Sequence, residues 1–429
     1  MFRRVAFYLV LAALALGLVG IPPTTVAQEV PNLSIIWFDW PPCHALAELV
    51  AGYEAANVSV QCIPIAQWHD QIFTDFAAGG GADLPVLDSQ FIGEAVVGGH
   101  IMELTGWMQE NIDVENFVPA AIQYYGEYPP GAQRYYGVPA IADVQVLVYR
   151  QDIFEQAGLE APDSLVELLG AAQLLKVSDL IENGFTWFWC GTPACLDQIQ
   201  VAVNQILWSW GGELWDPATY QVEGVLNSPQ NVRALEFARA LYLTGPEGAG
   251  NFTYSEVVDG ICNGTAAMTS IWVGFAASLV NPETCPMAAN LDFAVPPGQV
   301  AHFLSLGGQP ISVSAYTQNP EAALEFLAWF ESYDTQIQWV QLGGYSARID
   351  VLASEEFLNA APYNDVFAEA YQLVKDFWNL PEYNRMLEVQ GEWYNLAVTG
   401  QVSAQEALDE IAAAHQEILD EAYPEGPPQ

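Results

Sequence analysis

The order of apolar and amphipathic segments near the start of this chain constrains its fold more than any other feature. The predicted elements are, in chain order, a strand at 33–38, a helix at 45–56, a strand at 58–63, a helix at 67–78 and a strand at 84–87. This β–α–β–α–β order predicts a parallel sheet with helices on both faces. Ligands of such sheets bind at the carboxyl ends of the strands.

The rest of the chain continues the alternation of strands and helices. Two more strands are predicted at 135–139 and 144–149, and helices are predicted to begin after Ser228, Asn319 and Ser403. Serine is a typical N-cap residue, because its hydroxyl accepts a backbone N–H of the first turn. The sequence contains no low-complexity linker, so its 429 residues predict two lobes joined by more than one crossing.

The charge of the chain excludes some partners. Lys and Arg total 10 against 52 Asp and Glu, which gives a net charge of -42. Charged residues are only 14% of the chain, so bases are missing rather than acids in excess. Nucleic acid is excluded, because phosphates are bound by Lys and Arg, and anionic lipid is disfavoured. We hypothesise adaptation to saline or acidic surroundings, where screening or protonation relieves the self-repulsion.

Residues 1–27 are typical of an export signal. Arg3 and Arg4 precede an apolar run at 5–21, and Thr25-Val26-Ala27 has the small residues that signal peptidase accepts. The apolar run is about as long as a minimal membrane span, so an uncleaved N-terminal anchor is the alternative. Cleavage leaves 8 bases against 52 acids, a net charge of -44, and predicts a periplasmic or extracellular protein.

The cysteines agree with export. An even number in an exported chain predicts disulfides, and six cysteines allow 15 connectivities. Proximity in the sequence favours the pairs Cys43–Cys62, Cys190–Cys195 and Cys262–Cys285. The five histidines are scattered without ligand spacing and no CxxC pair occurs, so no metal site is expected.

Motifs that would indicate an enzyme or a cofactor are missing. The sequence has no GxSxG elbow, P-loop, HExxH or dinucleotide fingerprint. Gly79-Gly80-Gly81 follows a predicted helix and is read as a turn. A glycoside hydrolase needs only two carboxylates, and 52 acids always supply a pair, so this alternative stays open.

Aromatic residues stand beside acids and amides at several predicted strand ends. Trp40 adjoins Asp39, Phe91 follows the segment 88–90, and Trp187 and Trp272 lie near later strand ends. The apolar faces of sugars pack on aromatic rings, and their hydroxyls donate charge-assisted hydrogen bonds to carboxylates. The recurrence of both residue types together predicts a site for a hydroxylated ligand, although a single Trp is more often a core residue.

The chain resembles the extracellular solute-binding proteins of ABC importers, in the sugar-binding group that includes maltose-binding protein. The segments that carry the resemblance are 136–139 (YGVP), 143–154, 263–268 (NGTAAM), 306–309 (LGGQ), 319–330, 343–348 (GGYSAR) and 402–419. Two departures from the family are Gln151, where Lys is usual, and the lack of a lipid-attachment cysteine.

This resemblance implies an α/β fold of the type II periplasmic-binding-protein kind. Two lobes, each a mostly parallel sheet flanked by helices, hold the ligand in the cleft between them. The expected boundaries are a signal peptide at 1–27, an N-lobe at 28–142 and 299–338, and a C-lobe at 143–298 and 339–429. The expected ligand-binding residues are Asp39, Trp40, Asp88, Gln90, Phe91, Asp143, Trp187, Trp272, Phe275, Gln309, Tyr345 and Arg348.

The function implied is capture of a neutral sugar or polyol for a membrane permease, without cofactor, by a monomer. The aspartates accept hydroxyl hydrogen bonds, and Trp40, Trp272 and Tyr345 wall the sugar. Arg348 binds a hydroxyl or an acidic sugar group, or else forms a salt bridge with one of the many acids. The alternatives are the secreted glycoside hydrolase and a module that senses a solute without transporting it.

Overall fold

The computed structural model describes residues 30–376 and 379–427, and the structural statements below concern these residues. The predicted export signal at 1–27 lies outside them. Within the described part of the chain, no helix combines the length and the apolar character that crossing a membrane requires.

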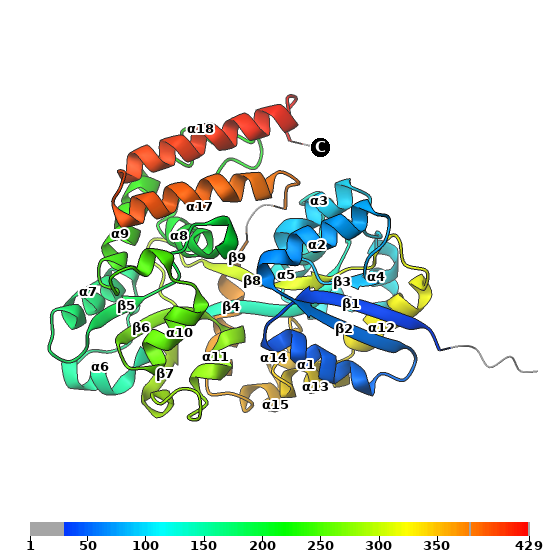
Figure 1. Ribbon diagram of the computed structural model, residues 1–429, viewed down its shortest axis with the longest axis horizontal. Coiled ribbons are helices and arrows are strands. Elements are labelled where there is room, and N and C mark those ends of the chain that lie inside the picture. The colour runs from blue at the N-terminus through cyan, green and yellow to red at the C-terminus, as the bar shows by residue number, and fades with distance from the viewer. Residues whose placement is uncertain (1–29, 377–378, 428–429) are drawn as a thin grey trace, which may run out of the picture. The chain divides into compact units, whose positions relative to one another are not determined.

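A small parallel sheet forms from the first part of the chain (Figure 1). Its strands lie in the order β2-β1-β3, and both β2 and β3 pair with β1 in parallel. The elements are β1 (Asn32–Phe38), α1 (Pro41–Leu49), β2 (Asn57–Ile63), α2 (Ile65–Ala77) and β3 (Leu84–Pro85). The predicted β–α–β–α–β order is confirmed.

Helix α1 begins four residues before the predicted start. Pro41 and Pro42 occupy its first turn, where proline is tolerated because the N–H groups there have no acceptor within the helix. The helix ends at Leu49 and is followed by a short 3₁₀ turn, η1 (Val50–Gly52). The predicted helix end at Ala56 is wrong, because residues 53–56 are not helical.

The two strands predicted at 135–139 and 144–149 are one strand, β4 (Val138–Arg150). Nearly all of its residues are buried, so no polar gap separates two strands. Pro139 lies where the register with β8 (Leu304–Ile311) shifts, a place that tolerates a residue without an N–H donor.

Strand β4 also changes partners along its length. Its first half pairs antiparallel with β8, and its second half pairs antiparallel with β6 (Ala266–Trp272) and β7 (Leu291–Ala294). The parallel pairs β5–β6 and β8–β9 complete a mixed sheet in the order β5-β6-β4-β8-β9. The outer strands are β5 (Asn183–Thr186) and β9 (Val374–Lys375). In Figure 1, β4 and β8 run side by side between the two groups of strands.

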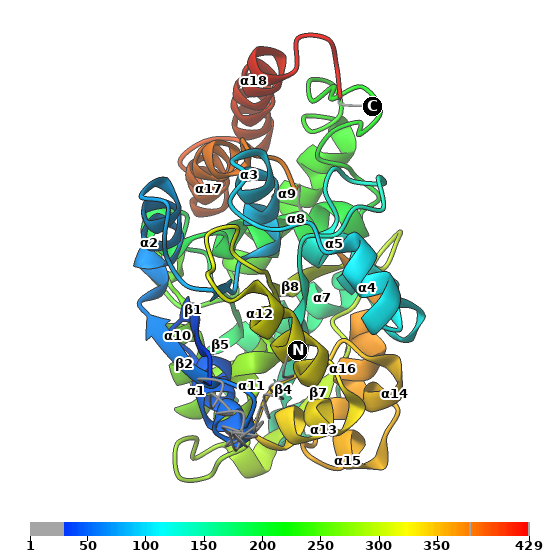
Figure 2. The same ribbon diagram turned by 90° about the vertical axis from the view of Figure 1, so that its right-hand side faces the viewer.

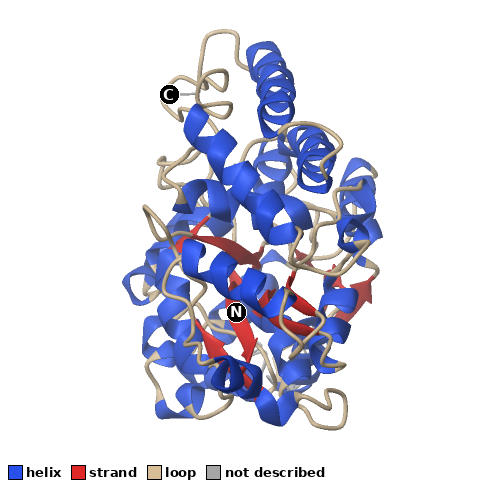
Figure 3. Cartoon of the chain, turned by 90° about the vertical axis from the view of Figure 1, so that its left-hand side faces the viewer, coloured by secondary structure: helices blue, strands red, loops and turns tan. Residues whose placement is uncertain are grey.

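Helices cover the strands on both faces, as Figure 3 shows. Between β3 and β8 they are α3 (Ile92–Val97), α4 (Thr105–Asn111), α5 (Pro119–Gly126), α6 (Gln151–Ala157), α7 (Leu165–Lys176), α8 (Gln198–Ser209), α9 (Pro229–Tyr242), α10 (Tyr254–Cys262) and α11 (Val273–Leu279). After β8 they are α12 (Pro320–Phe330), α13 (Tyr333–Gln341), α14 (Ile349–Leu352), α15 (Glu355–Leu358), α16 (Asn364–Ala370), α17 (Tyr383–Thr399) and α18 (Ala404–Ala422). The group α13 to α16 lies together in Figure 2.

The predicted helix caps and disulfides are confirmed. The hydroxyls of Ser228 and Ser403 accept the N–H groups of Asn231 and Glu406, while Asn319 precedes α12 without a side-chain cap bond. Disulfides join Cys43 to Cys62, Cys190 to Cys195 and Cys262 to Cys285. The mixed α/β architecture agrees with the predicted fold class, while the exact lobe boundaries stay a prediction.

Candidate ligand-binding cavity

A cavity lies between the end of the small sheet and the centre of the mixed sheet. The elements around it are the β1–α1 turn, the start of α2, the end of β3, the middle of β4 and β8, and the starts of α8, α10 and α11. The lining residues are Phe38, Trp40, Ile65, Trp68, Asp88, Asp143, Leu196, Asp197, Tyr254, Trp272, Phe275, Leu306, Gly307, Gly308 and Gln309.

The change of partners along β4 creates the polar centre of the cavity. Asp143 faces Gly307 of β8, and two residues later Gln145 faces Trp272 of β6. Gly307 leaves room for the Trp272 indole, because a Cβ there would lie 2.6 Å from its ring atom Cζ3. Asp143 and the Trp272 indole therefore lie together where the pairing of β4 changes from β8 to β6.

Aromatic rings form the walls. Trp40 stacks on Phe38 at 4.7 Å between ring centroids and lies 6.1 Å from Phe275. Phe275 in turn stacks on Tyr254 at 4.6 Å. Rings from the β1–α1 turn, α10 and α11 thus surround one space, which gives the apolar faces that a sugar ring packs against.

The carboxyl groups of the cavity are perturbed by burial. Burial raises the pKa of Asp143 to about 8, although backbone amides, Gly274 foremost, oppose the rise. Burial also raises the pKa of Asp197 to about 6. The pKa of Asp88 lies well above its usual range, first because it is buried and then because the charges of Asp197 and Asp376 repel its anion. Such shifts are typical of functional sites.

Several buried polar atoms of the lining have no hydrogen-bond partner among the described residues. They are Nε1 of Trp40, Oδ1 of Asp143 and Oε1 of Gln309. The three side chains are only 6%, 3% and 7% exposed, so solvent reaches them poorly. Buried polar groups are nearly always bonded, and these atoms therefore point to a bound molecule.

Six of the twelve predicted site residues line this cavity: Trp40, Asp88, Asp143, Trp272, Phe275 and Gln309. The other six do not. Phe91 lines a neighbouring depression described below, and the amide of Gln90 is buried without a partner close to the end of β3.

The remaining four are engaged elsewhere. The exposed Asp39 carboxylate lies 2.7 Å from His44 Nε2, and Trp187 Nε1 donates to Gln145 at 3.1 Å.

The Tyr345 hydroxyl donates to the backbone of α11 and contacts the Tyr363 hydroxyl. Arg348 forms an ion pair with Asp350 at 2.7 Å, stacks over a phenylalanine ring and donates to a backbone carbonyl. Of the roles predicted for Arg348, the salt bridge is the one present in the structure.

Sequence reasoning missed Asp197 and Tyr254. Tyr254 follows Thr253, whose hydroxyl and backbone N–H bond the Glu256 side chain in a capping box. This Thr-x-x-Glu spacing is visible in the sequence and marks the start of α10 at the cavity. Asp197 comes two residues after Cys195, and nothing in its neighbourhood marks it as a site residue.

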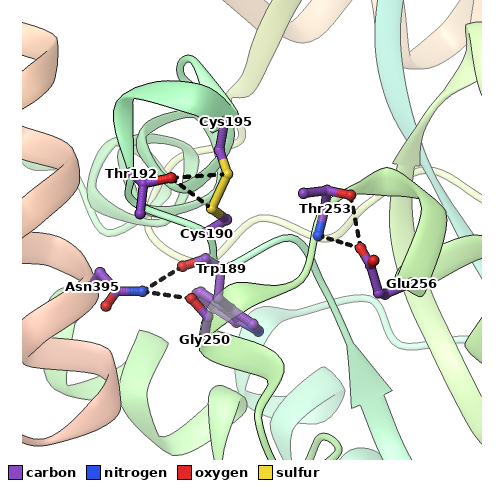
Figure 4. The surroundings of a disulfide bond; sticks show 8 residues. All are labelled: Trp189, Cys190, Thr192, Cys195, Gly250, Thr253, Glu256 and Asn395. Atoms are coloured by element: carbon purple, nitrogen blue, oxygen red, sulfur yellow. Dashed lines mark hydrogen bonds between the residues drawn. A yellow bond between two sulfur atoms is a disulfide. The ribbon is translucent and has the colours of Figure 1, made fainter. Parts of the chain in front are cut away.

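Figure 4 shows the contacts of the loops that precede these two residues in the chain. The disulfide between Cys190 and Cys195 closes a tight loop, and the Thr192 hydroxyl lies within 3.5 Å of both sulfurs. The Asn395 amide of α17 donates to the carbonyls of Trp189 and Gly250, both at 2.8 Å. One side chain therefore ties the loop before Asp197 to the loop before Tyr254.

A second depression adjoins the cavity and shares Ile65 and Leu196 with it. It is lined mainly by α2, the disulfide loop and α17. His69 Nε2 lies 3.0 Å from the Glu94 carboxylate and 2.8 Å from the side-chain amide nitrogen of Asn384 in α17.

Similar proteins agree with this architecture. A galactooligosaccharide-binding protein of Bacillus subtilis is 22% identical over 433 residues, covering 96% of each chain. A probable amino-acid ABC transporter periplasmic-binding protein of Sinorhizobium fredii is also 22% identical, over 72% of this chain and 70% of the relative.

Solved structures match in fold. A ribitol complex of an ABC transporter solute-binding protein from Agrobacterium radiobacter has a TM-score of 0.79 at 24% identity, covering 90% of this chain and 98% of the other. A maltose-bound protein of T. maritima has a TM-score of 0.80 at 23% identity, covering 90% and 100%. The sequence profile of the bacterial extracellular solute-binding proteins matches residues 44–337. With two thirds of its length matched, the chain belongs to the bacterial extracellular solute-binding protein family.

Proposed function

We propose that this protein captures a sugar or polyol in the cavity and delivers it to the permease of an ABC importer. The observation that carries the proposal is the pairing of aromatic walls with buried, unpartnered hydrogen-bonding atoms in one cavity. Trp40 and Trp272 offer flat apolar faces, and Asp143 Oδ1 and Gln309 Oε1 offer free acceptors. A hydroxylated ring or chain satisfies both, because its C–H faces pack on the aromatic rings and its hydroxyl groups donate to the acceptors.

The binding step follows from where the residues originate. Trp40 follows β1 of the small sheet, whereas Trp272 ends β6 of the mixed sheet. A ligand that touches both groups favours the arrangement in which they lie close, by its difference in affinity for the two states. Hinge closure of this kind is the usual response of periplasmic binding proteins. The protein works as a monomer, and the closed form presents the ligand to the permease.

The similar proteins support this choice. The names of three of them specify galactooligosaccharide, ribitol and maltose, which are hydroxylated and uncharged, whereas the fourth is named for amino acids. The net charge of -42 also disfavours anionic solutes. Family membership implies a periplasmic or extracellular location and a binding protein rather than an enzyme, so the glycoside hydrolase alternative is not supported.

Isothermal titration with a panel of mono-, di- and trisaccharides and polyols tests the proposal. At least one compound should bind, and Trp272→Leu should weaken its binding by about tenfold or more, because loss of an aromatic wall costs on the order of 1.4 kcal/mol. Trp107→Leu is the matched control, since Trp107 lies on α4 outside the cavity lining. Heat with a peptide or a metal ion, and none with any sugar or polyol, would reject the proposal.

A further inference from the structure

The cavity contains an unbalanced set of charges. Asp88, Asp143 and Asp197 contribute carboxyl groups to it, and none of the described lining residues is Lys or Arg. The charge of Asp197 acts on Asp88, and all three carboxyl groups act on the Tyr254 hydroxyl, so the groups are near neighbours. Partly desolvated carboxylates that lack a cation repel one another.

The nearby base Lys375 does not supply the missing positive charge. Lys375 is next to Asp376, whose charge also acts on Asp88. However, the ammonium group of Lys375 lies 2.7 Å from both carboxylate oxygens of Glu213 and 5.3 Å from the centroid of the Trp208 ring. The repulsion within the cavity is therefore not relieved by this lysine.

The unpartnered atoms of the polar centre also favour a positively charged group on the ligand. Asp143 Oδ1 and Gln309 Oε1 are acceptors, and their side chains are 3% and 7% exposed. An ammonium group carries three donors and one positive charge, whereas a hydroxyl carries one donor and no charge. A single ammonium thus satisfies neighbouring acceptors and offsets the carboxylates together.

The walls also suit a cation. Trp40, Trp272 and Tyr254 line the cavity, and the faces of Trp and Tyr rings attract a cation within about 6 Å of their centroids. The same rings accept the C–H faces of a sugar, so the two requirements do not conflict.

We infer that the ligand is a sugar or polyol that carries a protonated amine, whose ammonium group binds among Asp88, Asp143 and Asp197. This inference rests on the proposed function and narrows its ligand class. The C–H faces of the ligand stack on the aromatic walls, and its hydroxyl groups bond the remaining acceptors. With a neutral ligand the burial that raises the pKa values of these groups keeps them partly protonated. An ammonium group lets them ionise and pair with it, so the amine binds more tightly than its neutral counterpart.

Matched ligand pairs test the inference. Glucose against glucosamine and sorbitol against 1-amino-1-deoxysorbitol each exchange one hydroxyl for an ammonium, and N-acetylglucosamine keeps the nitrogen without the charge. Titration of the full chain at pH 7 should show at least one amine that binds about tenfold or more tightly than its neutral partner. That preference should shrink as salt is raised, because salt screens the charge interaction.

Variants assign the preference to the carboxyl groups. Asp197→Asn should reduce the ratio of amine to neutral affinity by about tenfold, since one charge partner is lost. Asp88→Asn should act in the same direction and serves as a second test if the first variant does not fold. Glu410→Gln, an exposed change on α18, should leave the ratio unchanged. Thermal unfolding confirms that each variant is folded.

The outcomes distinguish the inferred preference for amines from the proposed binding of sugars or polyols. Neutral members that bind as tightly as the amines, or more tightly, would overturn the inference while leaving the proposed function intact. A preference for amines that survives both aspartate variants would also overturn it. Absence of binding by every sugar and polyol, charged or neutral, would reject the proposed function itself.

Discussion

Gly274, at the start of α11, lies directly against the indole of Trp40, which follows β1. A Cβ added to Gly274 would lie 2.6 Å from the ring atom Cζ3 of Trp40. Real Cβ atoms do not approach other atoms this closely, so the closeness of the two elements depends on the absence of a side chain.

Gly274→Ala is therefore expected to weaken ligand binding by about tenfold or more, because Trp40 and α11 can no longer approach fully around the ligand. Isothermal titration with the best ligand of the panel measures the effect. Gly170→Ala is the control, since a Cβ at this position in α7 meets no atom within 4 Å. It should keep the affinity and raise stability by about 0.5–1 kcal/mol. Equal affinities for both variants would contradict the prediction.

Asn395 offers a test of the support for the cavity. Asn395→Ala removes the donor to the Trp189 and Gly250 carbonyls, so it should cost about 1–3 kcal/mol of stability and loosen the loops before Asp197 and Tyr254. Ligand affinity should fall together with stability, measured by titration and by urea unfolding. Asn359→Ala removes an exposed bond to the Glu355 carbonyl and should change neither. Unchanged affinity in Asn395→Ala would show that the loops hold their place without this residue.

The carboxyl groups of the cavity predict a pH dependence of stability. Burial raises the pKa of Asp143 from 3.8 to about 8 and that of Asp197 to about 6, so the folded state keeps protons that the unfolded chain has released. The free energy of unfolding should therefore carry a term that falls as the pH rises from about 4 to about 8.

Asp143→Asn removes one such group. Its stability relative to the unsubstituted protein should increase steadily between pH 4 and pH 8, as measured by urea unfolding at several pH values. Glu410→Gln, on the exposed side of α18, should show no such trend. A difference between Asp143→Asn and the unsubstituted protein that stays constant with pH would mean that this carboxyl group titrates normally.

The net charge of -42 predicts that salt stabilises the protein. Raising NaCl from 0.05 to 1 M shortens the Debye length several-fold, so repulsion among the 52 acids weakens and Tm should rise. An increase of at least about 2 °C is expected, the size of shift that 1 kcal/mol produces in domains of 150–250 residues. Differential scanning calorimetry measures it, and a Tm that stays constant or falls would argue against the charge as a destabilising force.

The sequence predicted the fold better than it predicted the site. The first strands and helices were recognisable because each apolar run is short and the intervening helices are amphipathic. Strand β4 was divided in two because its burial on both faces removes the alternation that marks a single strand. Nothing local records that its first half pairs with β8 and its second half with β6.

The site depends on such long-range pairings. Asp39 and Trp40 are neighbours in the chain, yet Asp39 is exposed beside His44 while Trp40 lines the cavity. Asp197 lines the cavity just after the disulfide loop that α17 contacts, and Arg348 forms its ion pair with Asp350 two residues away. A residue type at a strand end therefore indicates the edge on which a site forms, but not which side chains turn into it.

The change of partners along β4 has a mechanical consequence. Because β4 and β8 are paired through the middle of the molecule, any rotation of one group of strands relative to the other must flex them where Asp143 faces Gly307. Atoms at a pivot move least during a rotation. The polar centre would then keep its geometry in the empty and the occupied protein.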